Sequence, residues 1–132
     1  MILVDSNVLM YAGGAEHPNK RPALAFLKRV ASGELEAAVD AEVLQEIMHR
    51  YRALNRWPEG RAVYELAREL FPEVLAVTGQ VMDEAKKHAD DDPVLSARDA
   101  VHAAVVVTYK LEGICTFDRD FDRIPRCPRV GL

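Results

Sequence analysis

The sequence predicts a three-layer α/β/α domain with a mostly parallel central sheet. Short apolar runs alternate with amphipathic helical stretches along the whole chain, which is typical of strands joined by crossover helices. No tight hairpin signal such as Asn-Gly separates two apolar runs, so neighbouring strands are expected to run parallel. A length of 132 residues suits one hydrophobic core and is too short for two, so we expect a single domain over residues 1–132.

The first half of the chain predicts two strands and four helices. The unbroken apolar run at 2–4 is typical of a strand covered on both faces, and Asp5 or Ser6 can cap the helix that follows. The later helices have apolar residues at three- and four-residue spacing; one ends before Gly33 and another begins at Pro58. In chain order the predicted elements span residues 2–4, 7–12, 22–31, 35–40, 41–54 and 58–71.

The second half predicts a strand, two helices and a last strand. The three acids at 90–92 stand before a proline and are expected to form an exposed loop outside any site. Ser96 can cap the second helix, which is apolar over most of its circumference and is therefore expected to lie centrally. The predicted elements span residues 73–78, 79–89, 97–110 and 113–117.

Composition excludes a broad basic surface. The net charge is −4 and the isoelectric point is about 5.6, so binding of long nucleic acid through many phosphates is not expected. The longest apolar stretch, residues 103–108, is too short to cross a bilayer, and no leader precedes the first apolar run. The two cysteines, Cys115 and Cys127, lack metal-ligand spacing. These features predict a cytoplasmic protein without a membrane segment.

Acidic residues stand where the predicted strands end. Asp5 follows the first strand and Asp118 the last, while Asp99 lies in the first turn of the late apolar helix and Glu46 lies on a helix that leaves the sheet. Each alone has a structural explanation, as a helix cap, an Asx turn, a capping box with Ser96 or a solvated neighbour. Together they are expected to meet, because ligands of parallel sheets bind beyond the carboxyl ends of the strands.

Carboxylates that meet in this way need a neutralising partner. Mg²⁺ or Mn²⁺ is the commonest neutraliser of an all-oxygen acidic cluster, and no set of histidines and cysteines indicates zinc. His102 shares a helix face with Asp99 and is expected to be buried and hydrogen-bonded rather than catalytic. The chemistry that suits such a site is metal-assisted hydrolysis of a phosphodiester.

Four motifs carry a resemblance to a known family: "ILVDSNVLMY", "EVLQEIMHRY", "ARDAVHAAVV" and "GICTFDRDFDRIP". In this order and spacing the sequence resembles PIN-domain ribonucleases, and is similar to the VapC-type toxins of prokaryotic toxin–antitoxin pairs. The resemblance implies a PIN-like fold and a Mg²⁺- or Mn²⁺-dependent endoribonuclease that hydrolyses RNA. It also implies a type II toxin, a homodimer, and inhibition by a small antitoxin protein.

The resemblance further implies a quartet of catalytic acids: Asp5, Glu46, Asp99 and Asp118. Asp5 and Asp99 would be the principal metal ligands. Asp118 would complete the coordination, and Glu46 would act on the attacking water or from outside the ligand shell.

Four further positions enter through the resemblance or as alternatives to it. Asn7 lies beside the quartet, and Thr116 matches a small hydroxyl position that could hold a water or a phosphate. Glu42 remains an alternative to Glu46, one helical turn away, and Asp122 could assist or replace Asp118.

Two other functions remain open from the sequence. An aspartyl-phosphate phosphotransferase also places acids at strand ends, but Asp5-Ser6-Asn7 lacks a second acid, and no lysine stands near Asp118. A PIN-like module that binds RNA or protein without catalysis would keep the acids and lack cleavage.

Overall fold

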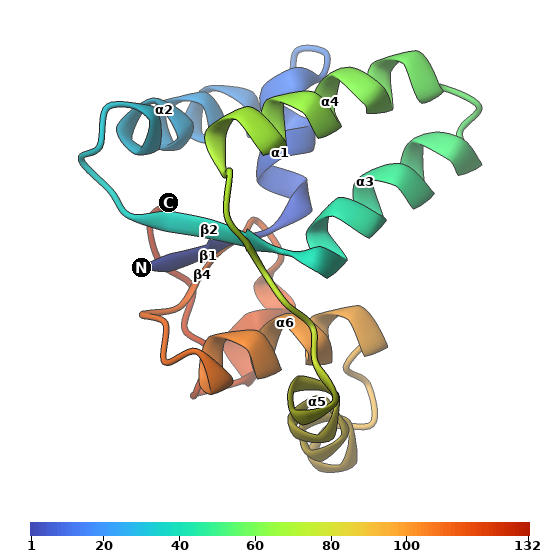
Figure 1. The fold of residues 1–132 in the computed structure, drawn as a ribbon, viewed down its shortest axis with the longest axis vertical. Helices are drawn as coiled ribbons and strands as arrows, with labels where there is room; N and C mark the ends of the chain where they lie inside the picture. The colour runs from blue at the N-terminus through green and yellow to red at the C-terminus, as the bar shows by residue number, and fades with distance from the viewer.

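The short apolar runs of the sequence form one sheet of four parallel strands between two layers of helices (Figure 1). The computed structural model describes residues 1–132. Along the chain the elements are β1 (Ile2–Val4), α1 (Ser6–Gly13), α2 (Lys20–Ala31), β2 (Ala37–Asp40), α3 (Ala41–Ala53), α4 (Trp57–Leu70), β3 (Val74–Leu75), α5 (Gly79–Asp91), α6 (Ala97–Thr108), β4 (Ile114–Cys115) and a 3₁₀ helix, η1 (Arg119–Arg123). The predicted fold class is therefore confirmed.

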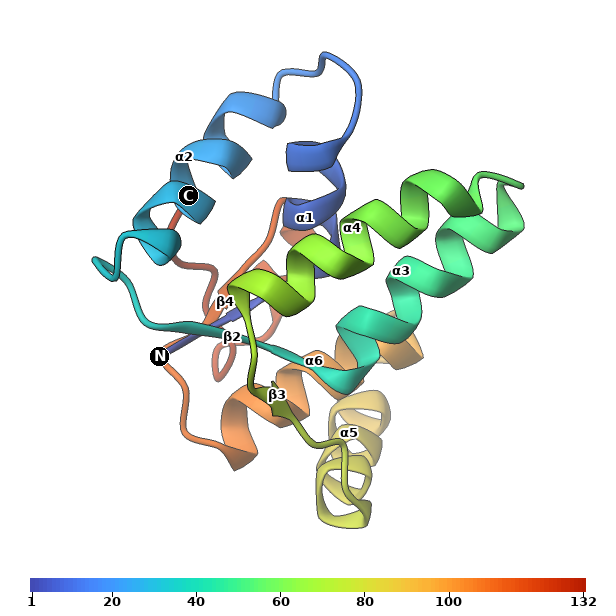
Figure 2. The same cartoon turned by 45° about the horizontal axis from the view of Figure 1, so that its top comes forward.

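The strand order is β3-β2-β1-β4. Beside β1, the order in which the chain adds strands to the sheet reverses. The chain leaves β1 toward β2 and β3 and later returns to pair β4 with the other side of β1. Helices α1 to α4 cover one face of the sheet and α5 and α6 the other (Figures 1 and 2). Right-handed crossovers require this change of face, and the switch point between β1 and β4 is where such sheets bind ligands.

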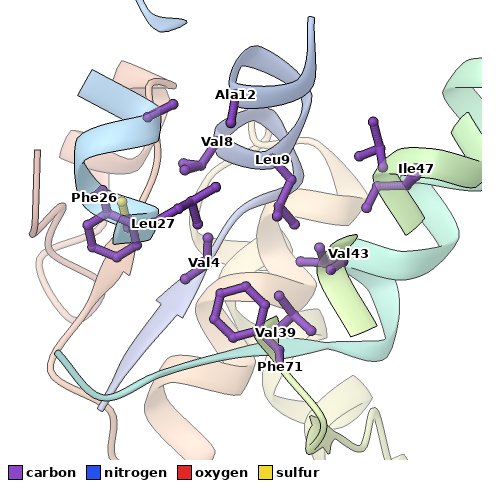
Figure 3. Packing of buried hydrophobic residues seen from close by; sticks show 14 of the residues in the cluster. Val4, Val8, Leu9, Ala12, Phe26, Leu27, Val39, Val43, Ile47 and Phe71 are labelled. Carbon is purple, nitrogen blue, oxygen red and sulfur yellow. The ribbon is translucent and has the colours of Figure 1, made fainter. Parts of the chain in front are cut away.

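Each strand contributes side chains to both helical layers, because successive residues of a strand point to opposite faces. Val4 and Cys115 belong to the core beneath α1 to α4, whereas Leu3 and Ile114 belong to the core beneath α5 and α6. Figure 3 shows the first core, in which Phe26, Leu27 and Phe71 pack against the strand residues. The apolar runs of β1 and β4 are unbroken because helices bury both of their faces.

Several element boundaries differ from the predicted ones. The last two strands pair over only two residues each, and α2 and α4 begin slightly before the predicted starts. Asp90 and Asp91, predicted as loop, form the last turn of α5. Lys86 forms an ion pair at 2.5 Å with Asp90 one turn later, and the Asp92 N–H donates a hydrogen bond to the His88 carbonyl.

None of the helices is long and apolar enough to cross a membrane.

Candidate active site

A cleft of about 790 Å³ opens at the carboxyl edge of the sheet, over the switch point between β1 and β4. All four predicted acids line it, although they come from four different elements of the chain. Asp5 and Asp118 follow the neighbouring strands β1 and β4, while α3 brings Glu46 and the first turn of α6 brings Asp99. The cleft forms here because parallel strands end together and their helices start at the same edge.

Asp5 is the most buried of the four acids, with only 5% of its surface exposed. It caps α1, since its Oδ1 accepts a hydrogen bond from the Ser6 N–H at 2.7 Å. Its Oδ2 accepts from the Thr116 hydroxyl at 2.7 Å and from the Asn7 amide at 3.2 Å. Burial raises the pKa of Asp5 above its ordinary value, although the nearby His102 opposes this shift.

Thr116 and Asn7 brace the turn after β1 against the loop after β4. The Thr116 hydroxyl donates to Asp5 and accepts from the Asn7 amide and from the Asp118 N–H, both at 3.0 Å. One hydroxyl offers one donor and two acceptor positions, so this one is fully used. In the structure the Thr116 hydroxyl bonds to protein groups that fix Asp5 and Asp118, and a role in holding a water or a phosphate stays a prediction.

Glu46 reaches the cleft and Glu42 does not. Glu46 Oε2 accepts from the Ser6 hydroxyl at 2.5 Å, and Oε1 lies 2.8 Å from His102 Nε2. Burial alone would raise the pKa of Glu46, but its hydrogen bond with His102 and the charge of that ring lower it overall. Glu46 therefore stays ionised, and the geometry favours it over Glu42 as the site acid of α3.

Asp99, Asp118 and Asp120 form the more open side of the cleft. One carboxylate oxygen from each lies within 4.8 Å of the others. Burial, with the charges of Asp118 and Asp5, raises the pKa of Asp99 to about 6. Asp118 Oδ1 also accepts from the Asp120 N–H at 2.9 Å, which is the Asx turn that begins η1.

Asp122, predicted to assist or replace Asp118, lies outside the cleft. Its carboxylate is exposed and forms two hydrogen bonds with Arg129, at 2.8 and 3.0 Å. It does not line the cleft, whereas Asp120 does. The 3₁₀ turn of η1 decides between them, because it points the residue two positions after Asp118 inward. No local pattern in the sequence distinguishes the two aspartates.

His102 lies at the back of the site, fully buried on α6. Its Nδ1 is 2.8 Å from Asp40 Oδ2 and its Nε2 is 2.8 Å from Glu46 Oε1, while Asp5 Oδ1 is 3.9 Å away. Burial alone would lower the pKa of His102, but the charge of Asp40 and the hydrogen bonds with both carboxylates raise it well above its ordinary value. The predicted burial is confirmed, and a protein cation in addition to any metal ion neutralises these acids.

The residues of the cleft fit a divalent metal ion with oxygen ligands. Asp5, Asp99, Asp118 and Asp120 supply carboxylates, the ligands that Mg²⁺ and Mn²⁺ prefer. Both ring nitrogens of His102 already face carboxylates, so the histidine does not complete a nitrogen-containing set. Burial, and then the charges of Asp118 and Asp5, raise the pKa of Asp99, and a bound cation would oppose this shift.

Two arginines on the walls of the cleft lack a carboxylate partner. Arg50 lies one turn after Glu46 on α3, and Arg98 precedes Asp99; both are exposed and neither forms an ion pair. Arg56, by contrast, is paired with Glu59. The acidic floor of the cleft is therefore bordered by free positive charge.

Comparison with known proteins shows which family this chain resembles. The PIN domain model matches residues 2–126. A VapC ribonuclease of Mycobacterium bovis is 39% identical over 131 residues, which cover 99% of this chain and 100% of that protein. Ribonuclease VapC13 of Mycobacterium tuberculosis gives the same identity and coverage.

Solved structures share the fold at lower identity. Mycobacterium tuberculosis VapC20, described as a Sarcin-Ricin loop cleaving toxin, superimposes with a TM-score of 0.75 at 20% identity, over 100% of this chain and 98% of that one. A toxin–antitoxin complex from Klebsiella pneumoniae gives a TM-score of 0.69 at 18% identity, over 97% of this chain and 96% of that one. The three-layer fold of this chain is thus shared with these solved structures.

Proposed function

The chain belongs to the VapC ribonucleases of the PIN-domain family, and on that premise we propose that it is a metal-dependent endoribonuclease and the toxin of a type II toxin–antitoxin pair. One observation carries the proposal: carboxylates from four separate elements meet in a single cleft at the switch point of the sheet. Full-length relatives named as ribonucleases support the substrate class.

In this proposal Asp5, Asp99 and Asp118 hold Mg²⁺ or Mn²⁺, with Asp120 at the open edge of the cleft. When bound, such an ion supplies activation of water and stabilisation of the charge that develops on the phosphate. Glu46 would orient the attacking water through a hydrogen bond to its ionised carboxylate, and its lowered pKa makes it a weak base for removing a proton. Asn7 and Thr116 hold the ligand-bearing turns of β1 and β4 in register.

The remaining parts of the proposal concern partners and location. A small antitoxin protein is the proposed inhibitor, and the shared fold with a Klebsiella pneumoniae toxin–antitoxin complex supports it. A homodimer and a cytoplasmic location follow from the family resemblance and complete the proposal.

The aspartyl-phosphate alternative is not favoured. The residue two positions after Asp5 is Asn7 and not a second acid. No lysine lines the cleft.

Metal removal tests the proposed function. Purified protein freed of any co-purifying polypeptide should cleave RNA with added Mg²⁺ or Mn²⁺, lose this activity in excess chelator, and regain it when the ion is restored. The measurement is product formation on a labelled RNA. Cleavage of equal rate with and without chelator would contradict the proposal, and absence of cleavage under all conditions would favour a binding module.

Replacing Arg50 with glutamate should weaken RNA binding. Because Arg50 is an unpaired cation on the cleft wall, Arg50→Glu is expected to raise KM for RNA about tenfold at low salt, with little change in kcat. The slope of log KM against log salt concentration should fall by about one. Arg21→Glu on α2 is the matched control, since it makes the same charge change at an exposed residue outside the cleft. Equal KM values for the two variants would show that Arg50 does not contact RNA.

A further inference from the structure

We infer that His102 is a positioning residue for Glu46: together with Asp40 it forms a buried bridge that fixes the Glu46 carboxylate in the cleft. His102 itself touches neither RNA nor a metal ion. Its effect on catalysis rests on the proposed function, whereas the bridge itself does not.

The ring of His102 is held at both ends. Nδ1 lies 2.8 Å from Asp40 Oδ2 and Nε2 lies 2.8 Å from Glu46 Oε1, on opposite sides of a fully buried imidazole. A carboxylate only accepts hydrogen bonds, so each ring nitrogen donates an N–H. A ring anchored at two points cannot turn, and no ring atom remains free for a substrate.

Asp40 gives the bridge its anchorage. It is the last residue of β2 and is itself fully buried. Its Oδ1 caps α3 by accepting from the Val43 N–H at 2.8 Å, while its Oδ2 holds His102. One carboxylate therefore fixes both the start of the helix that bears Glu46 and the ring that contacts Glu46.

The bridge also sets the spacing between two helices of the site. His102 lies on α6, one turn after Asp99, and Glu46 lies on α3. A direct contact from His102 to Glu46 therefore ties the helix of a proposed metal ligand to the helix of the proposed water-orienting acid. Small misplacements of reacting groups cost large factors in rate, which makes such a tie relevant to catalysis.

Glu46 depends on this contact for its orientation. Its long side chain is held from two directions, by His102 at Oε1 and by the Ser6 hydroxyl at Oε2. Glu42, one turn earlier on the same helix, makes no side-chain hydrogen bond and does not reach the cleft. Without His102, the Glu46 carboxylate would keep a single partner and would leave its position part of the time.

A double-mutant cycle separates positioning from a general structural role. His102→Asn and Asp40→Ser are each made alone and with Glu46→Gln. Asparagine is too short to bridge two carboxylates, and serine still caps α3 but does not reach His102. With saturating metal and RNA, each single change should lower kcat about 10- to 100-fold with little change in KM. Combined with Glu46→Gln, neither should lower kcat further.

Equal losses of kcat in both backgrounds would overturn the inference, because His102 would then act independently of Glu46. His88→Asn is the matched control: His88 is also buried, but it lies on α5 outside the cleft and its Nε2 has no hydrogen-bond partner. This variant should cleave RNA like the wild type. Asp40→Ser keeps the inference testable if His102→Asn fails to fold.

Proton NMR of the metal-free protein tests the bridge without RNA. His102 should show two ring N–H protons protected from exchange with water; Glu46→Gln should move chiefly the Nε2 proton, and Asp40→Ser chiefly the Nδ1 proton. A single ring N–H, or no response to Glu46→Gln, would overturn the inference. If both protons are present and the wild type does not cleave RNA, the proposed function fails while the bridge stands.

Discussion

Asp5→Asn is expected to lower RNA cleavage by about a thousandfold or more while leaving the fold intact. Asp5 is buried and forms hydrogen bonds with Ser6 of α1 and with Thr116 after β4. Asparagine has nearly the same volume and keeps an oxygen that can cap α1, but it carries no charge. A neutral amide is a poor ligand for Mg²⁺ or Mn²⁺, so the site would lose one of its proposed metal ligands. Loss of electrostatic stabilisation in a transition state costs factors of this order. The measurement is the single-turnover rate on a labelled RNA.

A control variant makes this result specific. Asp83→Asn makes the same chemical change at an exposed position of α5 outside the cleft and should cleave at the wild-type rate. Thermal unfolding of both variants would show whether a loss of rate reflects unfolding. Asp5→Asn protein that is folded and cleaves RNA within about tenfold of the wild type would reject Asp5 as a metal ligand.

Asp99→Asn should stabilise the metal-free protein at neutral pH although it removes activity. The pKa of Asp99 is about 6 in the folded chain and 3.8 as the reference value, so the folded state binds more protons between these values. Stability of the wild type therefore falls as pH rises through this window, and the penalty is complete above it. After a discount for partial solvent exposure, the variant should gain about 1–2 kcal/mol at about pH 7.

The pH profile distinguishes this cause from a packing effect. Urea unfolding of both proteins should give curves that coincide near about pH 4 and diverge as pH rises toward about 7. Added Mn²⁺ should narrow the gap, because the ion stabilises only a protein that binds it. A difference in the free energy of unfolding that does not change with pH would mean that ionisation of the Asp99 carboxylate does not cause this difference.

The architecture was predictable because its signals are local. Unbroken apolar runs indicate strands buried on both faces, and apolar residues at helical spacing indicate the crossover helices. The meeting of Asp5, Glu46, Asp99 and Asp118 could be predicted from this architecture, since parallel strands end at one edge. The order and spacing of the four sequence motifs indicated the family.

Contacts between distant residues were not predictable in the same way. Asp40 ends the predicted strand at residues 35–40, and only its pairing with His102, 62 residues later, reveals its role in the site. Likewise Asp120 faces the cleft and Asp122 does not because of the η1 turn and Arg129, which no local pattern specifies. The difference at Asp90 and Asp91 is a local one, because these residues continue α5, where Asp90 forms an ion pair with Lys86. In the first two cases a tertiary or side-chain contact overrides the local preference.

The proposed function depends on carboxylates that come together on folding to bind a divalent ion, and calorimetric titration with Mn²⁺ measures that binding directly. Metal-free wild-type protein should take up Mn²⁺, and Asp99→Asn should bind it at least about tenfold more weakly. Absence of Mn²⁺ uptake by the wild type, or equal affinity in the two proteins, would contradict a metal site at Asp5, Asp99 and Asp118.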